Sequence, residues 1–263
     1  KILHQDPLTD SGIYYFPDET RIFKGKALII GPEDTPYHHG FYLFDFTFPE
    51  SYPFKPPKVI YQTRYSNIRF NPNLYTCGKV CVSILNTWNG PQWTSCQSIK
   101  SVLLSLQMLF TKNPIHNEPG YENVNDDRSV RYCKVIQHSN YAIAINRMLT
   151  TPPPGFEVFL PIMREYFIKN FADIKTKMET YILFDSHRIN SGIYGMSIIP
   201  EYKKNLLQLI SLFKMYTTDL TIENKMELLK IKDETKPPKK KCPSQPAKNF
   251  PNGWTAKSDN DGR

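Results

Sequence analysis

Alternating hydrophobic and polar residues in the first sixty positions predict a series of short β-strands. The side chains of segment 41–48 that share one face are all aromatic: Tyr42, Phe44, Phe46 and Phe48. Segment 21–30 alternates in the same way, and shorter extended segments are expected at 13–16 and 59–62. Because short turns join these segments, an antiparallel four-stranded meander is the simplest arrangement.

After position 98 the hydrophobic residues recur at helical spacing instead. Helices are expected at 98–110, 128–148, 156–183 and 201–216. Ser98 is a candidate N-cap of the first helix, and Pro161 must lie near a helix start or at a kink. Segment 191–200 is predicted to be a loop. Strands followed by helices indicate an α+β fold, with helices flanking the sheet.

The composition is that of an ordinary globular chain, not of a membrane protein or a disulfide-rich scaffold. The 263 residues are 40% hydrophobic and 22% charged, enough to bury a full core. No apolar run approaches the roughly 20 residues that cross a bilayer, so no membrane span is expected. The odd number of scattered cysteines argues against a disulfide framework and for a reducing interior: Cys77, Cys81, Cys96, Cys133 and Cys242.

The basic charge is concentrated at the C-terminal end. Residues 221–263 hold ten basic and six acidic residues, half of the net charge of +8. A general nucleic-acid surface is therefore not indicated, and no specific nucleic-acid partner is expected. The run Lys236–Lys241 is either an anion-binding or nuclear-localisation patch or, as we favour, part of a solvated, flexible tail.

The candidate chemistry lies in segment 70–85, where Cys81 follows Asn73 by eight residues. No strong base adjoins Cys81, which argues against a protease-like pair. A thiol in this setting can accept an acyl group from another thioester and pass it to an amine. The Asn73 amide can stabilise the oxyanion that aminolysis creates. Each signal alone is weak, since a cysteine between valines is usually a small buried hydrophobe.

Together, these motifs resemble those of the ubiquitin-conjugating enzymes. The order is a proline-rich loop at 52–57, Phe70–Asn73, Gly78–Cys81, a tryptophan and an apolar helix, and the resemblance covers roughly residues 5–148. Segments 83–93 and 113–120 are most similar to the large Z-type members, which carry a helical C-terminal extension.

The resemblance implies three parts of the chain. Residues 1–149 would form the catalytic core, whose first helix is truncated to Lys1–Gln5. Residues 150–220 would form a helical extension packed on the core, and 221–263 the basic, Pro/Lys-rich flexible tail.

By this resemblance, Cys81 is the thioester cysteine and Asn73 the oxyanion donor or loop organiser. Asn71 stands where most members have His, a residue regarded as a structural brace for this loop. The proposal requires that the Cys81 sulfur be reachable by solvent and that the Asn73 side chain face it.

The resemblance implies two further sets of site residues. His116, Asn117 and Glu118 would form the gate that the acceptor lysine passes, where a carboxylate or a solvent-excluding wall orients the ammonium and favours loss of its proton. Which of the three residues has this role is left open. A mere helix-connecting turn is an equal alternative for this segment. The ligase-docking residues would be Phe54, Trp93, Ser95 and Cys96, although Trp93 is also a candidate for packing.

The function implied is transfer of ubiquitin, or a ubiquitin-like modifier, from an activating enzyme to substrate lysines through Cys81, usually with a RING- or HECT-type ligase. No cofactor is expected, because ATP is used by the activating enzyme. No metal is expected either, since Cys77 and Cys81 lack a second ligand pair. The alternatives are a catalytically silent ubiquitin-binding scaffold and a cysteine hydrolase that pairs Cys81 with His116. An intracellular location, cytoplasmic or nuclear, fits all three.

Overall fold

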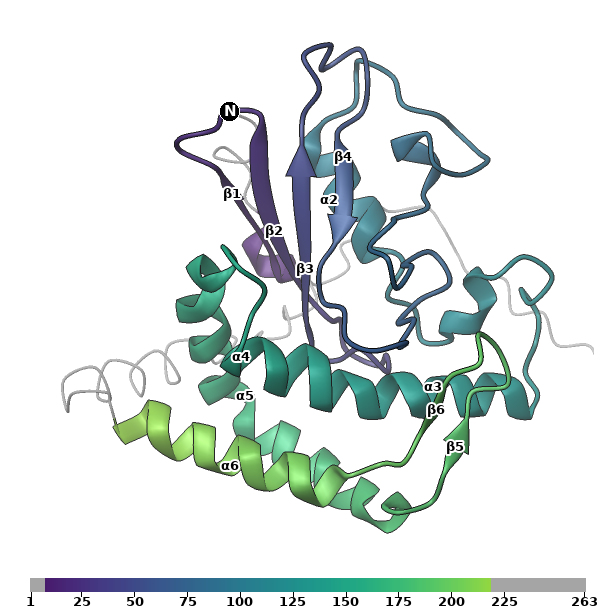
Figure 1. The fold of residues 1–263 in the computed structure, drawn as a ribbon, viewed down its shortest axis with the longest axis vertical. Helices are drawn as coiled ribbons and strands as arrows, with labels where there is room; N and C mark the ends of the chain where they lie inside the picture. Colours follow the sequence, from purple (N-terminus) through teal and green to yellow (C-terminus); the bar gives the residue numbers. More distant parts are fainter. Residues whose placement is uncertain (1–7, 219–263) are drawn as a thin grey trace, which may run out of the picture. The chain divides into compact units, whose positions relative to one another are not determined.

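Four antiparallel strands form the main sheet of the structure, a computed structural model that describes residues 8–218 (Figure 1). The strands are β1 (Ile13–Pro17), β2 (Lys24–Ile30), β3 (Phe41–Thr47) and β4 (Lys58–Tyr61), paired in this order. The predicted meander is therefore confirmed. β2 begins three residues later than predicted, because the Asp18 side chain accepts hydrogen bonds from the backbone of Thr20 and Arg21 and fixes a turn there.

One face of the sheet packs against two helices, α2 (Ile99–Gln107) and α3 (Asp127–Ser139). The other α-helices of the described residues are α4 (Met148–Thr150), α5 (Leu160–Tyr181) and α6 (Tyr202–Thr218). The aromatic row of β3 predicted from the sequence lies in this core, where Tyr42 and Phe44 contact the same buried cluster as Leu103 of α2 and Val135 of α3.

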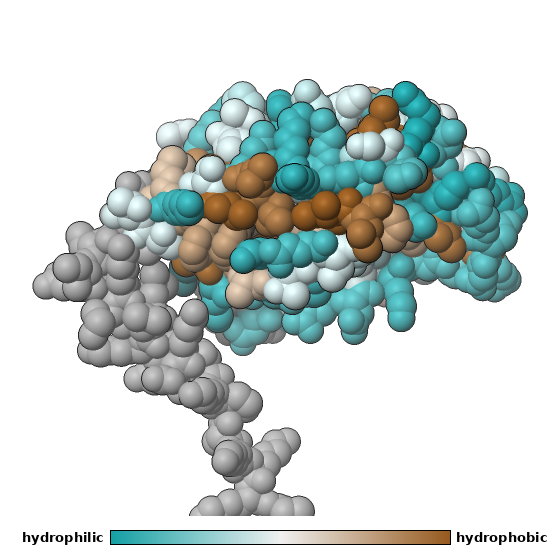
Figure 2. Space-filling view, turned by 90° about the horizontal axis from the view of Figure 1, so that it is seen from below, coloured by the Kyte–Doolittle hydropathy of each residue, from teal (hydrophilic) through white to brown (hydrophobic). Residues whose placement is uncertain are grey.

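The opposite face of the sheet packs against the later helices. Leu28 of β2 and Leu43 of β3 share a second core with Met163 of α5 and Leu209 of α6. In Figure 1, α6 lies below the sheet and α3. Figure 2 shows this side of the molecule, with a band of hydrophobic residues across it. The exposed apolar residues of α6 include Leu207 and Met215.

The predicted helix at 128–148 has an irregular second half. α3 continues into a π-helical segment, Asn140–Arg147, and then into the short α4. The buried Asn140 side chain accepts from the Tyr42 hydroxyl at 2.6 Å and donates to the His38 carbonyl at 2.8 Å. The change of helix type thus coincides with a polar contact to the sheet and its loop. Pro161 lies in the first turn of α5, as predicted.

The predicted loop at 191–200 is wrong in part, because this region forms a small hairpin. Strands β5 (Ile189–Asn190) and β6 (Ser197–Ile198) pair in an antiparallel manner and lie beside α3. The signal was weak because each strand has only two residues. Met196 of this hairpin is almost fully buried in the first core, so the hairpin packs with the sheet and α3.

Short 3-10 turns complete the described chain: Thr9–Ser11, Ser83–Leu85, Pro114–Asn117, Glu157–Phe159 and Ile182–Phe184. None of the helices within 8–218 is both long and apolar enough to span a bilayer. The predictions for Lys1–Gln5 and for the tail 221–263 lie outside the described residues.

Candidate active site

The candidate nucleophile lies in a loop that is attached to the open edge of β4. The Tyr61 amide donates to the Gly78 carbonyl at 2.9 Å, and Ile60 forms a bridge with Lys79. Gly78 has a φ of +94°, and a Cβ at this position would lie 2.9 Å from an Ile60 side-chain carbon. Glycine is therefore required where the loop approaches the strand most closely.

Asn73 and Cys81 face each other across this loop and exchange two hydrogen bonds. The Cys81 amide donates to the Asn73 carbonyl at 2.9 Å, and the Asn73 side-chain Nδ2 donates to the Cys81 carbonyl at 2.6 Å. The structure thus brings together the two residues that the spacing of eight selected. In this geometry the Asn73 side chain organises the loop around the cysteine.

The expected solvent-reachable sulfur is not observed, because Cys81 is only 2% exposed. The Thr87 hydroxyl fixes the two residues that flank the cysteine. Its oxygen accepts from the Val82 amide at 3.0 Å and lies 2.8 Å from the Val80 carbonyl, to which it donates. The expectation that the Asn73 side chain faces the sulfur is met in part. The side chain is turned toward Cys81, but it binds the main-chain carbonyl of the cysteine.

Asn71, at the position of the family histidine, is fully buried and braces the same loop. Its Nδ2 donates to the Leu109 carbonyl at 2.8 Å and to the Tyr37 hydroxyl at 3.2 Å. Its Oδ1 accepts from the Asn73 amide at 2.9 Å. The amide of Asn71 therefore ties residues 70–81, here called the nucleophile loop, to the core.

The predicted gate residues point in different directions. Asn117 donates to Asn71 Oδ1 at 3.3 Å, which joins the gate to the hydrogen bonds around Cys81. His116 Nε2 lies 3.0 Å from the Val124 carbonyl and 2.8 Å from Asn113 Nδ2, so this imidazole braces its own loop. Glu118 Oε2 accepts a hydrogen bond from the Tyr194 hydroxyl.

The two predicted ligase-docking loops are adjacent but contribute different kinds of side chain. Phe54 is 80% exposed, and Ser95 and Cys96 are exposed in the loop before α2. Trp93 is only 8% exposed, and its indole Nε1 donates to the Pro53 carbonyl at 2.7 Å. Trp93 therefore holds the two loops together, and Phe54 is the exposed aromatic residue.

A stack of side chains next to the nucleophile loop was not predicted from the sequence. The Arg69 guanidinium lies between the rings of Tyr75 and Tyr194, 3.9 Å and 4.1 Å from their centroids. Arg69 Nη2 also donates to the Pro72 carbonyl at 2.5 Å, within the Phe70–Asn73 motif. The stack could not be predicted from a local sequence pattern, because Arg69 and Tyr194 are far apart in the sequence.

Two other chemically suggestive groups have structural roles. Burial raises the pKa of the Cys133 thiol to about 11, which disfavours the nucleophilic thiolate. Within the described residues, the ligand atoms of His38, His39 and Asp173 lie within 4.8 Å of one another. However, Lys177 Nζ lies 2.8 Å from Asp173 and 3.0 Å from His38, so an ammonium already supplies the positive charge there.

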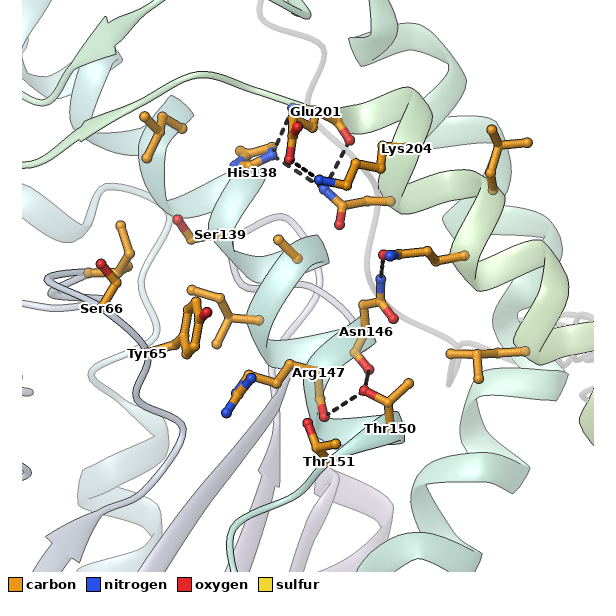
Figure 3. A pocket seen from close by; sticks show the side chains of 18 of the residues that line it. Tyr65, Ser66, His138, Ser139, Asn146, Arg147, Thr150, Thr151, Glu201 and Lys204 are labelled. Atoms are coloured by element: carbon orange, nitrogen blue, oxygen red, sulfur yellow. Dashed lines mark hydrogen bonds and ion pairs between the residues drawn. The ribbon is translucent and has the colours of Figure 1, made fainter.

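The large cavity shown in Figure 3 lies elsewhere, between the π-helical segment, α6 and the loop at 65–68. Its volume is about 850 Å³. Polar groups join across it: Asn146 donates to Gln208 at 2.5 Å, and His138 Nε2 accepts from the Glu201 amide at 3.1 Å. It contains no cysteine and no residue of the nucleophile loop, so we assign it no part in the chemistry.

Comparison with known proteins decides the family. The family model for ubiquitin-conjugating enzymes matches residues 4–140, just over half of the chain. The chain belongs to the ubiquitin-conjugating enzyme family. The matched range contains the sheet, α2, α3 and every predicted site residue, and the resemblance inferred from the motifs is confirmed.

Relatives named for the Z-type of this family are similar over the same length. Ubiquitin-conjugating enzyme E2 Z of Homo sapiens is 44% identical over 162 residues, which cover 61% of this chain and 46% of that protein. The E2 Z of Xenopus tropicalis is 49% identical over 162 residues, 61% of this chain and 52% of that protein. A probable ubiquitin-conjugating enzyme, protein 17 of Caenorhabditis elegans, is 43% identical over 178 residues, 62% and 24% of the respective chains. The chain spans about half the length of the E2 Z relatives.

Proposed function

We propose that this protein carries ubiquitin or a ubiquitin-like modifier as a thioester on Cys81 and transfers it to lysine. The observation that carries the proposal is the reciprocal pair of hydrogen bonds between Asn73 and Cys81. The pair lies within the range that matches the family model. The pair gives the spacing of eight residues a physical meaning, because the Asn73 amide is held beside Cys81.

The reaction requires two acyl transfers at one sulfur. First, Cys81 Sγ forms a bond to the modifier's terminal carbonyl carbon, and the thiol of the activating enzyme leaves with a proton. The lysine nitrogen then forms a bond to the same carbon and loses a proton, which ends on water, while the C–Sγ bond breaks and Cys81 departs as thiolate. An amide carries two N–H groups, so Asn73 can keep its bond to the Cys81 carbonyl and offer the second N–H to the oxyanion.

The burial of Cys81 adds a requirement for local opening. A residue that is 2% exposed cannot receive the end of another protein unless its neighbours move. The chain contains its own controls, because Cys77 and Cys96 are exposed. Alkylation with iodoacetamide, followed residue by residue with mass spectrometry, should modify Cys77 and Cys96 first and Cys81 more slowly but completely. A Cys81 that stays unmodified in the folded protein would contradict the opening step.

The direct test is a charging assay with activating enzymes, ATP and a panel of modifiers. We expect an adduct of one modifier mass that an added thiol cleaves. The adduct should be absent in Cys81→Ala and present in Cys133→Ser. An adduct that survives Cys81→Ala would refute the assignment of the nucleophile.

The same assay addresses the alternative functions. A silent scaffold would bind ubiquitin without charging. The hydrolase alternative has little support, since His116 Nε2 is engaged by Val124 and Asn113. Hydrolysis of a fluorogenic amide at the C-terminus of ubiquitin would support the hydrolase alternative.

The partners follow from the same proposal: an activating enzyme, a RING- or HECT-type ligase that contacts Phe54, and protein substrates. The exposed Phe54 beside Ser95 and Cys96 supports the docking site. The location proposed is intracellular. Charging with different activating enzymes and modifiers also decides which of them the protein uses.

A further inference from the structure

The hairpin β5–β6 carries a side chain that reaches the gate. The Tyr194 hydroxyl, at the tip of this hairpin, donates a hydrogen bond to Glu118 Oε2. Tyr194 lies outside residues 4–140, the range that matches the family model. A segment beyond the matched core therefore contacts a residue predicted to receive the acceptor lysine.

The conformation of Tyr194 indicates that this contact is specifically maintained. Its φ is +58°, in the left-handed region that non-glycine residues seldom adopt. Its ring is held by Arg69, 4.1 Å from the centroid, and by an edge-to-face contact with Tyr132. Backbone strain of this kind persists only where the surroundings stabilise it, and it is often found at functional sites.

The hairpin does not need this hydrogen bond in order to stay attached. Met196 is buried in the core, and its sulfur accepts from the Arg69 amide at 3.1 Å. Ile193 and Ile198 pack against the same core. The Tyr194–Glu118 bond therefore adds little to attachment, and its main consequence is to fix the position of the Glu118 carboxylate.

We propose that Tyr194 is a positioning residue for acyl transfer, which fixes the Glu118 carboxylate at the gate through its hydroxyl. This inference rests on the proposed function. It makes the β5–β6 hairpin a part of the acceptor site, so that the region beyond the matched core supports the chemistry itself.

One oxygen of the Glu118 carboxylate remains available to accept a proton. Tyr194 occupies Oε2 of Glu118, and in the part of the chain that the structure describes the other oxygen, Oε1, accepts no hydrogen bond. When the lysine nitrogen bonds to the thioester carbon and the C–Sγ bond breaks, the proton released from nitrogen passes to Oε1 and then to water. Burial and the bond to Glu118 raise the pKa of the Tyr194 phenol, so the phenol remains a donor at neutral pH.

The same ring connects the gate to the nucleophile loop. Arg69, stacked on Tyr194, donates to the Pro72 carbonyl next to Asn73. Tyr194 thus contacts Glu118 directly and the nucleophile loop through Arg69. Removing only its hydroxyl separates its effect on Glu118 from its packing.

The test compares four variants: Tyr194→Phe, Glu118→Gln, the double variant, and Tyr216→Phe as a matched control. Tyr216 lies in α6, is buried, and donates its hydroxyl to the Leu149 carbonyl at 2.9 Å, away from the gate. Each variant is charged with ubiquitin or whichever modifier the wild type accepts, and the isolated thioester is then discharged to free lysine.

We expect Tyr194→Phe to charge at a rate within twofold of the wild type but to discharge about three- to tenfold more slowly. A positioned general base contributes about a hundredfold or more to a rate, and loss of its positioning should remove a part of that factor. The double variant should discharge as Glu118→Gln does, because the two residues act as one unit. Tyr216→Phe should leave both rates within twofold. Glu118→Asp, whose shorter side chain loses the Tyr194 contact, should reproduce the defect if Tyr194→Phe folds poorly.

Two outcomes would overturn the inference while the proposed function stands. One is a normal discharge rate in Tyr194→Phe or in Glu118→Gln. The other is an effect of Tyr194→Phe that is fully retained in the Glu118→Gln background, as a purely structural role would give. Failure of the wild type to charge at Cys81 would instead refute the proposed function, and the inference with it.

Discussion

Replacing Asn71 with alanine tests the brace that holds the nucleophile loop. The fully buried side chain makes hydrogen bonds to the Leu109 carbonyl, the Tyr37 hydroxyl, the Asn73 amide and Asn117. The Leu109 carbonyl still accepts from Asn117 at 3.2 Å in the variant, but the Asn73 amide loses its acceptor. A buried unsatisfied donor costs about 1–3 kcal/mol and each lost hydrogen bond about 1 kcal/mol, so we expect a loss of about 3 kcal/mol.

The assay is thermal unfolding followed by calorimetry. For a folded unit of this size, 1 kcal/mol shifts Tm by about 2–4 °C, so the expected fall is roughly 6–12 °C. Asn67→Ala is the matched control, because Asn67 is exposed in the same connection, and its effect should stay within about 0.5 kcal/mol.

The charging rate gives a second, independent readout of Asn71→Ala. It should fall at temperatures where the variant is still folded, because the amide of Asn73 and with it the Cys81 loop lose their anchor. The reasoning is refuted if Asn71→Ala lowers Tm no more than Asn67→Ala does. A large fall in Tm with unchanged charging of the folded fraction would show that Asn71 stabilises the core without organising the site.

Three further predictions address chemistry, docking and acid sensitivity. Asn73→Ala should retain charging but slow lysine discharge by about 10²–10³, as loss of an oxyanion donor does; equal losses in both steps would indicate a loop organiser alone. Phe54→Ala should abolish stimulation by a ligase and leave intrinsic discharge and Tm unchanged, measured side by side with and without the ligase. Burial lowers the pKa of His39 and of His138 to about 4, so both contribute stability above pH 6.5 that is lost as the pH falls toward 4. Urea unfolding should show about 2 kcal/mol less stability per histidine at pH 5 than at pH 7, and His138→Gln should reduce this pH dependence.

The sheet was predictable because its information is local. The alternation at 41–48 alone places Tyr42 and Phe44 on one face, and the structure has them in the first core. The same alternation places Leu43 on the opposite face of the sheet, and the structure has Leu43 in the second core. The hairpin β5–β6 was not predictable, because two-residue strands carry no period and its stability comes from Met196, buried among residues far away in the sequence.

The contacts of the candidate site were likewise predictable where they are local in the sequence and not where they are distant. A spacing of eight residues was sufficient to pair Asn73 with Cys81, since one loop holds both. The contacts of Tyr194 with Glu118 and Arg69 join residues 76 and 125 positions apart, and no pattern along the chain encodes them. The burial of Cys81 was equally hidden, because exposure depends on what folds over a residue.

These contacts also limit how Cys81 can become accessible. Its backbone is fixed to Asn73 on one side, and the Thr87 hydroxyl holds both of its neighbours on the other. Moving the cysteine itself would break several hydrogen bonds of about 1 kcal/mol each, a large part of the stability of a typical domain. We therefore expect Cys81 to become accessible through movement of the groups around its sulfur and not of its own backbone. The backbone of Cys81 and its hydrogen bonds to Asn73 can then remain in place throughout the proposed reaction.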